Sequence, residues 1–183
     1  MRIISGTLKG RKIHAPVALP VRPTTDFAKE ALFNILNNLV DFNDCEVLDL
    51  FAGTGNITYE FVSRNAKSIL SVDINSRCVD FIKKTAFDLE LKNIKAVKMD
   101  AFAFIAICKA KYDIIFCDPP YTMDFTKLIQ LPEIIFNQQL LNLNGLLIIE
   151  HQKNINFVKH PNFFDQRHYG KVNFSFFKFE NIQ

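Results

Sequence analysis

The sequence has no apolar run long enough to cross a membrane, and its first residues do not resemble an export leader. Its 183 residues are 49% hydrophobic and 22% charged, and none of its apolar stretches approaches the roughly 18 consecutive residues of a spanning helix. Residues 1–6 do not carry the apolar segment of a signal peptide. We therefore expect a cytoplasmic protein that has no membrane partner.

Cysteine and histidine are too few and too scattered to suggest a metal site or a disulfide framework. The chain has four of each, and no two cysteines form a Cys-x-x-Cys pair. Zinc sites and disulfide-rich domains both use closely spaced cysteines or histidines. We expect reduced, mostly buried thiols, no bound metal and no catalytic histidine.

Internal repeats, low-complexity tracts and linker-like segments are absent as well. A chain of 183 residues fits one α/β domain that buries roughly 70% of its unfolded surface. We expect residues 1–183 to form a single domain, with residues 1–40 as a basic hairpin-and-helix extension and residues 41–183 as the main sheet.

Short apolar runs alternate with stretches of helical periodicity, and this alternation predicts the fold. Repeated strand–helix–strand units imply a mostly parallel sheet, and two phenylalanine-rich segments at the end imply an antiparallel pair. The expected strands are residues 47–51, 69–73, 96–100, 112–117, 146–150, 163–169 and 171–179. The expected helices follow residue 25 and cover residues 57–65, 76–91, 102–108 and 124–142, the last one interrupted at Pro132.

The first expected helix is preceded by a short hairpin over residues 2–14. Thr25 and Asp26 are both suitable N-caps for the helix. Residues at helical spacing predict that one face of this helix packs in the core: Ala28, Ala31, Leu32, Ile35, Leu36 and Leu39.

Positive charge is concentrated near the start of the chain. The net charge is +3, but residues 1–30 contain six Lys and Arg against two acids, or +4, which leaves 16 − 17 = −1 for the rest. A basic arm on a nearly neutral body indicates a polyanionic partner, because phosphate contacts dominate nucleic-acid affinity. A solvated terminus without a partner is the alternative.

Four aspartates fall at the ends of successive expected strands: Asp49, Asp73, Asp100 and Asp118. Core strands tolerate charge poorly, and ligands of open α/β sheets bind beyond the carboxyl ends of the strands. Together the four acids therefore indicate a shared crevice. N-capping of the following helices is the alternative for Asp73 and Asp100.

The turn after the first main strand contains Gly53-Thr54-Gly55, which allows a ligand to approach the backbone closely. The third glycine of a dinucleotide fingerprint is missing, and no lysine follows in Walker order. Asp73, twenty residues after Gly53, can accept both hydroxyls of a ribose. Asp100 and Phe102 can supply an amine acceptor and an apolar wall for an adenine.

An apolar run ends abruptly at Asp118-Pro119-Pro120-Tyr121. The two prolines remove backbone donors and hold the chain in one extended shape. Asp118 and the proline carbonyls are acceptors, and Tyr121 has a flat face for a planar ring. This loop suits an aromatic amine, although Tyr121 is also compatible with an ordinary core position.

These two segments resemble known methyltransferase motifs. Residues 49–55 resemble motif I of S-adenosylmethionine-dependent methyltransferases, and residues 118–121 resemble motif IV of the amino-methylating group. Further segments resemble the RsmD family of small-subunit ribosomal RNA guanine methyltransferases: Arg2-Ile3-Ile4, Lys9-Gly10-Arg11-Lys12, Arg22-Pro23-Thr24, Glu30-Ala31-Leu32-Phe33-Asn34, Glu60, Ser63-Arg64 and Tyr169-Gly170. The chain departs from the family pattern at Ser5, Thr58 and Asn65.

The resemblance implies a Rossmann-like class I methyltransferase in which residues 41–183 form the catalytic sheet, with S-adenosyl-L-methionine as cofactor. The implied substrate is the 2-amino group of one guanine in 16S rRNA, within a 30S particle, and the protein is expected to be a monomer. The implied catalytic residues are Asp118, Pro119, Pro120 and Tyr121. The implied cofactor-binding residues are Asp49, Phe51, Ala52, Gly53, Thr54, Gly55, Asp73, Ile74, Asp100, Ala101 and Phe102. The implied RNA-binding residues are Lys9, Arg11, Lys12, Arg22 and Thr24. For the four basic residues, contact with the cofactor carboxylate is the alternative, and for Arg22 also bracing of the first helix.

Other amino-methyltransferases are the nearest alternatives. A protein-glutamine enzyme would carry Asn-Pro-Pro-Tyr, whereas this chain has Asp118, and a DNA adenine or cytosine enzyme would carry a separate target-recognition segment. A non-catalytic ribosome-assembly factor would not need intact Asp49, Gly53, Gly55, Asp73 and Asp118.

Overall fold

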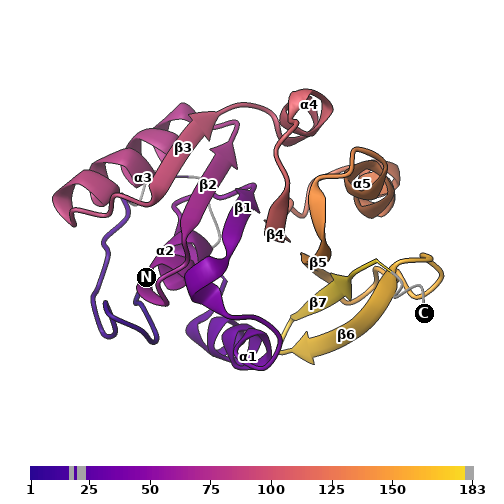
Figure 1. Ribbon diagram of the computed structural model, residues 1–183, viewed down its shortest axis with the longest axis horizontal. Coiled ribbons are helices and arrows are strands. Elements are labelled where there is room, and N and C mark those ends of the chain that lie inside the picture. The colour runs from indigo at the N-terminus through magenta and orange to yellow at the C-terminus, as the bar shows by residue number, and fades with distance from the viewer. Residues whose placement is uncertain (17–18, 20–23, 180–183) are drawn as a thin grey trace.

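The computed structural model describes residues 1–16, 19 and 24–179, which form a seven-stranded sheet with helices on both faces (Figure 1). The strand order is β3-β2-β1-β4-β5-β7-β6. The first five of these pair in parallel, and β7 runs antiparallel between β5 and β6. The strands are β1 Glu46–Leu50, β2 Ser68–Asp73, β3 Ile94–Lys98, β4 Tyr112–Cys117, β5 Leu141–Gln152, β6 Phe163–Tyr169 and β7 Val172–Phe177. The helices are α1 Asp26–Leu36, η1 Phe42–Asp44, α2 Asn56–Ser63, α3 Ser76–Asp88, α4 Ala101–Ile107 and α5 Phe125–Asn137.

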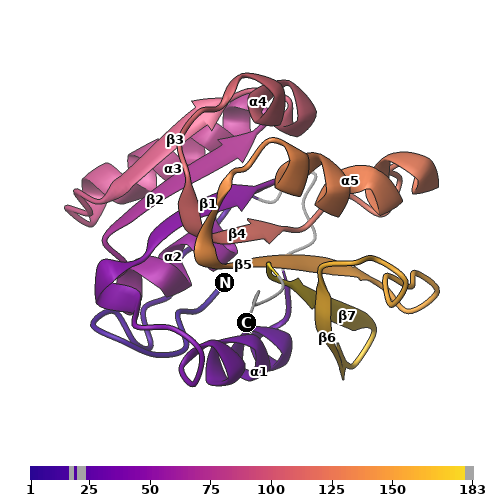
Figure 2. The ribbon, with the colours of Figure 1, turned by 45° about the vertical axis from the view of Figure 1, so that its right-hand side comes forward.

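Alternation along the central strands separates the core into two layers. Leu48, Ile115 and Ile149 face α4 and α5, whereas Ile114 and Ile148 face α1 and α2. Figure 2 shows α5 and α1 on opposite sides of β5. This is the expected Rossmann-like α/β fold with a mostly parallel sheet and an antiparallel pair at its end.

Three elements differ from the sequence-based expectation. Strand β3 ends at Lys98, so Asp100 lies beyond it, and β5 begins at Leu141 because its start pairs with Tyr112 before a register shift. Helix α5 continues through Pro132 without interruption and ends at Asn137, so the expected helical residues 138–142 lie outside it, the last two of them in β5. None of the helices in the part of the chain that the structure describes has the length and apolar composition needed to cross a bilayer.

Helix α1 begins as expected, and its buried face includes the predicted Ala28, Leu32 and Leu36 but is wider than predicted. The Thr25 side chain accepts a hydrogen bond from the Ala28 amide at 3.2 Å and caps the helix. The expected core position of Leu39 is wrong, since this residue lies beyond the helix and is 47% exposed. Lys29 and Phe33 are buried in addition to Ala28, Leu32 and Leu36. The buried face therefore includes a lysine, which a search for apolar periodicity passes over.

The amino-terminal residues form a hairpin-like loop that docks on α2. A single antiparallel bridge joins Arg2 to Lys12. Ser63, at the end of α2, holds the loop: its carbonyl accepts the Thr7 amide at 2.7 Å, and its hydroxyl accepts the Leu8 amide at 2.9 Å. Because Gly6 has φ +85° and lies against the Ser63 backbone, a side chain does not fit there.

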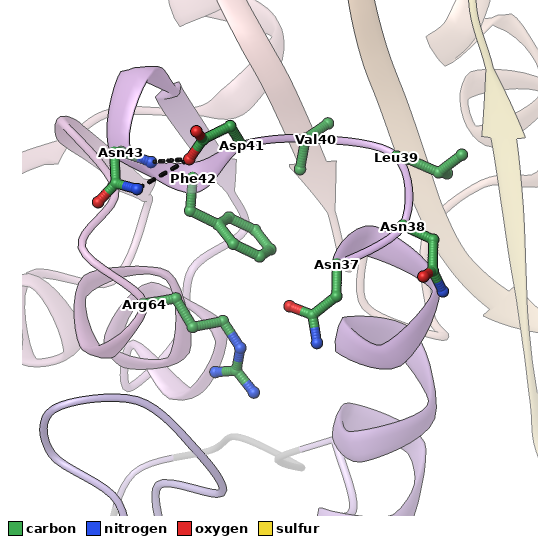
Figure 3. A pocket seen from close by; sticks show the side chains of 8 residues that line it. All are labelled: Asn37, Asn38, Leu39, Val40, Asp41, Phe42, Asn43 and Arg64. Atoms are coloured by element: carbon green, nitrogen blue, oxygen red, sulfur yellow. Dashed lines mark hydrogen bonds between the residues drawn. The ribbon is translucent and has the colours of Figure 1, made fainter.

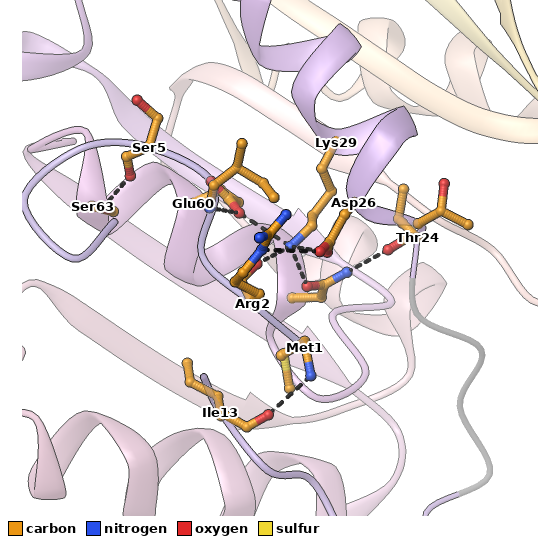
Figure 4. A network of polar contacts seen from close by, with 12 residues as sticks. Met1, Arg2, Ser5, Ile13, Thr24, Asp26, Lys29, Glu60 and Ser63 are labelled. Carbon is orange, nitrogen blue, oxygen red and sulfur yellow. Dashed lines mark hydrogen bonds and ion pairs between the residues drawn. The ribbon is translucent and has the colours of Figure 1, made fainter. Parts of the chain in front are cut away.

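A buried ion pair joins this loop to α1 and α2 (Figure 4). The Lys29 ammonium donates to the Arg2 carbonyl at 2.6 Å, to Asn56 Oδ1 at 2.9 Å and to Glu60 Oε1 at 3.1 Å. Glu60 also accepts hydrogen bonds from the Ile4 amide and the Arg64 guanidinium. A buried carboxylate needs such partners, because an unpaired charge in the interior is strongly unfavourable.

We expect Lys29→Met to lower the free energy of unfolding by about 3–5 kcal/mol, because it removes the ammonium and leaves Glu60 buried with fewer partners. Urea unfolding measures the change. Lys84→Met is the matched control, since the exposed pair of Lys84 with Asp88 contributes at most about 0.5 kcal/mol. Equal effects of the two substitutions would contradict the role assigned to Lys29.

Gly6→Ala and Gly10→Ala separate the docking contact from backbone strain. Both glycines have a positive φ, but a Cβ on Gly6 would lie 1.8 Å from the Ser63 carbonyl oxygen, whereas a Cβ on Gly10 has no neighbour within 4 Å. We expect Gly10→Ala to destabilise by about 1–2 kcal/mol and Gly6→Ala to destabilise more and to expose the loop to proteolysis. Similar stability and similar cleavage of both variants would show that the loop is not docked this way.

Candidate active site

A cavity of about 940 Å³ opens at the carboxyl ends of the parallel strands. It lies where the strand order reverses between β1 and β4, the place where open α/β sheets bind ligands. Its walls come from elements far apart in the sequence, from Thr24 before α1 to Val172 at the start of β7. The predicted site residues among them are Thr24, Asp49, Phe51, Ala52, Gly53, Thr54, Asp73, Ile74, Asp100, Ala101, Asp118, Pro119, Pro120 and Tyr121.

The four strand-end aspartates all reach this cavity, but they differ in their protein partners. Asp73 accepts the Gly53 amide at 2.7 Å and the Asn75 amide at 2.8 Å, so it ties the glycine turn to the end of β2. Asp100 accepts the Ala103 amide at 3.0 Å and is the N-cap of α4. The capping alternative therefore applies to Asp100, whereas Asn75 rather than Asp73 caps α3.

Asp49 lies at the base of the cavity and is almost completely buried. The Thr58 hydroxyl donates to Asp49 Oδ2 at 2.5 Å and also contacts the Ser71 hydroxyl at 2.8 Å. Burial raises the pKa of Asp49 to about 7, and the charge of Asp73 adds to that rise, while the hydrogen bonds from Thr58 oppose it. Thr58, which departs from the family pattern, thus supplies a partner for this carboxylate.

The turn after β1 has three residues with positive φ: Phe51 at 62°, Gly53 at 53° and Gly55 at 80°. Gly55 does not line the cavity; it precedes α2, and a Cβ there would meet Ile82 and Tyr59 at 3.0 Å. Phe102 also lies outside the lining and packs edge-on against Phe51, with 6.4 Å between ring centroids. Both residues therefore shape the turn from behind rather than form the cavity wall.

The Asp-Pro-Pro-Tyr loop follows β4 directly and lines the cavity. The Asp118 amide donates to the Leu50 carbonyl at 3.4 Å, and the Pro120 carbonyl accepts the Met123 amide at 2.8 Å. These bonds hold both ends of the loop. Tyr121 is 42% exposed, so it lies at the mouth of the cavity and not in the core.

The predicted RNA-binding residues do not gather at the cavity in the way that the four aspartates do. Lys9, Arg11 and Lys12 belong to the docked loop, and none of them lines the cavity. Arg22 lies outside the described residues. Among the described members of the predicted RNA-binding set, Thr24 alone is found in the cavity wall, where its hydroxyl donates to Glu150 at 2.8 Å.

Several wall residues escaped the sequence-based prediction. Asn56 and Glu150 are polar and buried, and the turn between β6 and β7 supplies Tyr169, Gly170 and Lys171. Glu150 had a detectable pattern, because it ends an apolar run in the same way as the four aspartates. In the turn, Tyr169-Gly170 resembles the family pattern but was not predicted as part of the site, since its place in the cavity wall depends on β7 lying next to β5.

A second hollow, of about 510 Å³, lies beyond the end of α1 (Figure 3). Asn37, Asp41, Phe42 and Arg64 are among the residues that line it. Its charged groups have structural partners: Asp41 caps η1, and Arg64 pairs with Glu60 and lies 4.1 Å from the centroid of the Phe33 ring. This arrangement braces the fold and provides no reactive group.

The raised pKa of Asp49 predicts a pH-dependent stability. The folded protein keeps this proton up to about pH 7, whereas the unfolded chain loses it near pH 4. The stabilising contribution of Asp49 is therefore complete below pH 4 and is lost as the pH rises through about 7. In urea unfolding without cofactor, we expect Asp49→Asn to gain stability relative to the wild type between pH 5 and pH 8. A constant difference between Asp49→Asn and the wild type over this pH range would contradict the assignment.

Comparison with known proteins gives matches over nearly the whole chain. Residues 1–178 match the family described as conserved hypothetical protein 95. A putative rRNA methyltransferase YlbH from Bacillus subtilis is 35% identical over 159 residues, which are 85% of this chain and 84% of the relative. A ribosomal RNA small subunit methyltransferase D from Buchnera aphidicola is 32% identical over 157 residues, 85% of this chain and 78% of the relative.

Solved structures agree with these matches. A putative methyltransferase yhhF from Escherichia coli superposes with a TM-score of 0.84 at 26% identity and covers 98% of this chain and 99% of its own. A putative methylase from Haemophilus influenzae has a TM-score of 0.77 at 25% identity and covers 96% of both chains. With the motif residues gathered in one cavity, these matches show that the chain belongs to the RsmD family of S-adenosylmethionine-dependent methyltransferases.

Proposed function

We propose that this protein methylates the exocyclic 2-amino group of one guanine in 16S ribosomal RNA. The observation that carries the proposal is the position of Asp118 and its two prolines in a large cavity at the switch in strand order, next to the glycine turn. One relative named as a small-subunit rRNA methyltransferase and one named as a putative rRNA methyltransferase support RNA as the substrate. The residues of the cavity wall and of the loop after β4 are suited to this reaction.

The cavity suits S-adenosyl-L-methionine, which supplies an electrophilic methyl group on a sulfonium. Ile74 is 66% exposed at the cavity and offers an apolar surface for an adenine, with Asp100 as an amine acceptor. Asp73 is oriented by two backbone amides and can accept ribose hydroxyls, because a carboxylate has about four acceptor sites. Gly53 leaves the backbone open to close approach, and Asp49 places a carboxylate at the base of the cavity.

The loop after β4 can activate the acceptor amine by positioning. The lone pair of this amine is delocalised into the guanine ring, which makes the nitrogen a weak nucleophile. If Asp118 accepts one N–H and the Pro119 carbonyl accepts the other, the nitrogen is biased toward a tetrahedral shape with its lone pair directed at the methyl group. Such orientation provides most of the rate enhancement, and a proton can leave after transfer without a histidine base.

Tyr121 is suited to hold the target base. It lies at the mouth of the cavity with a large part of its ring exposed. Enzymes that modify base edges take the base out of its stack and hold it against aromatic side chains. We assign Tyr121 to this stacking role.

The amino-terminal residues are suited to the RNA backbone. Residues 1–30 carry a charge of 6 − 2 = +4, and phosphate contacts supply much of the affinity for RNA. We propose that residues 1–40 form the RNA-binding extension of a single catalytic domain, that a cytoplasmic monomer acts on the 30S particle, and that Lys9, Arg11 and Lys12 contact phosphates rather than the cofactor.

Methyl transfer tests the proposal directly. Labelled S-adenosylmethionine is offered with under-methylated 30S particles, naked ribosomal RNA, DNA or release factor, and the labelled nucleosides are analysed. We expect 2-methylguanosine in small-subunit RNA and a loss of about 100-fold or more in Asp118→Ala, because the amine is no longer positioned. Calorimetry should show that Asp118→Ala still binds the cofactor, and Asp88→Asn should retain full activity.

Other outcomes of this experiment identify the alternatives. Label in adenosine, DNA or protein would overturn the guanine assignment in favour of another amino-methyltransferase. The absence of cofactor binding and of transfer to every acceptor would indicate an RNA-binding assembly factor. Unchanged activity of Asp118→Ala would refute the positioning mechanism.

A further inference from the structure

A second carboxylate, that of Glu150 on β5, lies beside Asp118 where β4 ends. Strands β4 and β5 pair in parallel with Cys117 opposite Ile149, so Asp118 and Glu150 follow a matched pair of residues. Neighbouring strands are about 4.8 Å apart, and both carboxylates line the same cavity. Glu150 therefore lies next to the proposed acceptor of the amine.

Glu150 is held in place by the buried network of the amino-terminal half. It is 4% exposed, and its Oε2 accepts a hydrogen bond from the Thr24 hydroxyl at 2.8 Å. The Thr24 carbonyl accepts from Asn56 Nδ2 at 2.9 Å, and Asn56 Oδ1 accepts from the Lys29 ammonium at 2.9 Å (Figure 4). This chain of bonds fixes the carboxylate, whose two oxygens offer about four acceptor sites and so can bond more than one donor.

A carboxylate at this position prefers guanine to the other amino acceptors, because the groups next to the amine differ among them. In guanine, the ring nitrogen N1 on one side of the 2-amino group carries a hydrogen, so two donors lie side by side on the Watson–Crick edge. In adenine and in cytosine, the ring nitrogen next to the amino group carries a lone pair, which a carboxylate repels. A glutamine side chain has a carbonyl oxygen next to its amide nitrogen and is repelled in the same way. Paired carboxylates thus match guanine and disfavour the other amino acceptors.

We propose that Glu150 determines base specificity by accepting the N1–H of the target guanine while Asp118 accepts the adjacent amine. The inference rests on the proposed function, since it assumes that the acceptor amine binds at Asp118. Enzymes that read a base outside its stack do so through hydrogen bonds to its Watson–Crick edge. A site built to bond a substrate N–H strongly rejects an analogue that lacks this hydrogen.

The test compares guanosine with 2-aminopurine riboside at the methylated position. The analogue keeps the 2-amino group but carries a lone pair at N1. Each base is placed by ligation in ribosomal RNA, the RNA is rebuilt into particles, and the rates of methyl transfer are measured. We expect the wild-type protein to prefer guanosine by about 100-fold or more.

In Glu150→Gln we expect guanosine methylation to fall about 10- to 100-fold, as a charge-assisted hydrogen bond is lost. Methylation of 2-aminopurine should stay the same or rise, because the new amide can donate to its N1. The guanosine preference should therefore drop at least tenfold, a change that a purely structural role for Glu150 does not produce. Glu133→Gln, exposed on α5, is the matched control and should keep the wild-type preference.

The two proposals fail in different ways. A guanosine preference that stays within twofold of the wild type in Glu150→Gln overturns the role of Glu150. A wild-type protein that does not methylate guanosine overturns the proposed function instead. If Glu150→Gln does not fold, Thr24→Val decides: it removes the hydroxyl that positions Glu150, and it should lower the preference at least threefold, with an unchanged preference counting against the proposal.

Discussion

The arrangement of this protein depends on one buried ammonium group. Lys29 binds Glu60, Asn56 and the backbone of the amino-terminal loop at once, so α1, α2 and the loop share a single charged centre. Because an uncompensated charge is costly in the interior, the partners of Lys29 must keep one relative arrangement. Through Asn56 and Thr24 that arrangement reaches Glu150 in the cavity wall. The same interactions that dock the amino-terminal segment therefore also orient a group of the candidate active site.

Most of the fold could be predicted from local patterns. Buried parallel strands are nearly continuous apolar runs, and such runs identified β1, β2, β4 and the centre of β5. Apolar runs predicted the ends of a strand poorly where pairing with a neighbouring strand determines those ends. β5 extends to Gln152 because β7 pairs with its far end, and β3 ends before Asp100, which instead caps a helix. Leu39 fitted the apolar face of α1 but lies after the helix has ended.

The residues of the candidate site also fall into two groups: those that local patterns predict and those that only long-range strand pairing places. The strand-end aspartates and the Asp-Pro-Pro-Tyr loop were predictable, since topology alone brings the carboxyl ends of parallel strands together. Gly55 and Phe102 were expected at the cofactor, but they lie behind the wall and support Phe51 and α2. Tyr169 and Lys171 reach the cavity only because β7 runs antiparallel beside β5. Their position depends on long-range pairing that no local pattern reveals.

The cavity wall draws on residues from Thr24 to Val172, and the strand inserted last into the order of the sheet, β7, carries one side of it. No short segment of the chain contains the whole cavity wall. A short fragment that holds the glycine turn lacks the β6–β7 turn, and a short fragment that holds β6 and β7 lacks the glycine turn. The candidate site is therefore indivisible: a truncation from either side of the span from Thr24 to Val172 removes part of the wall.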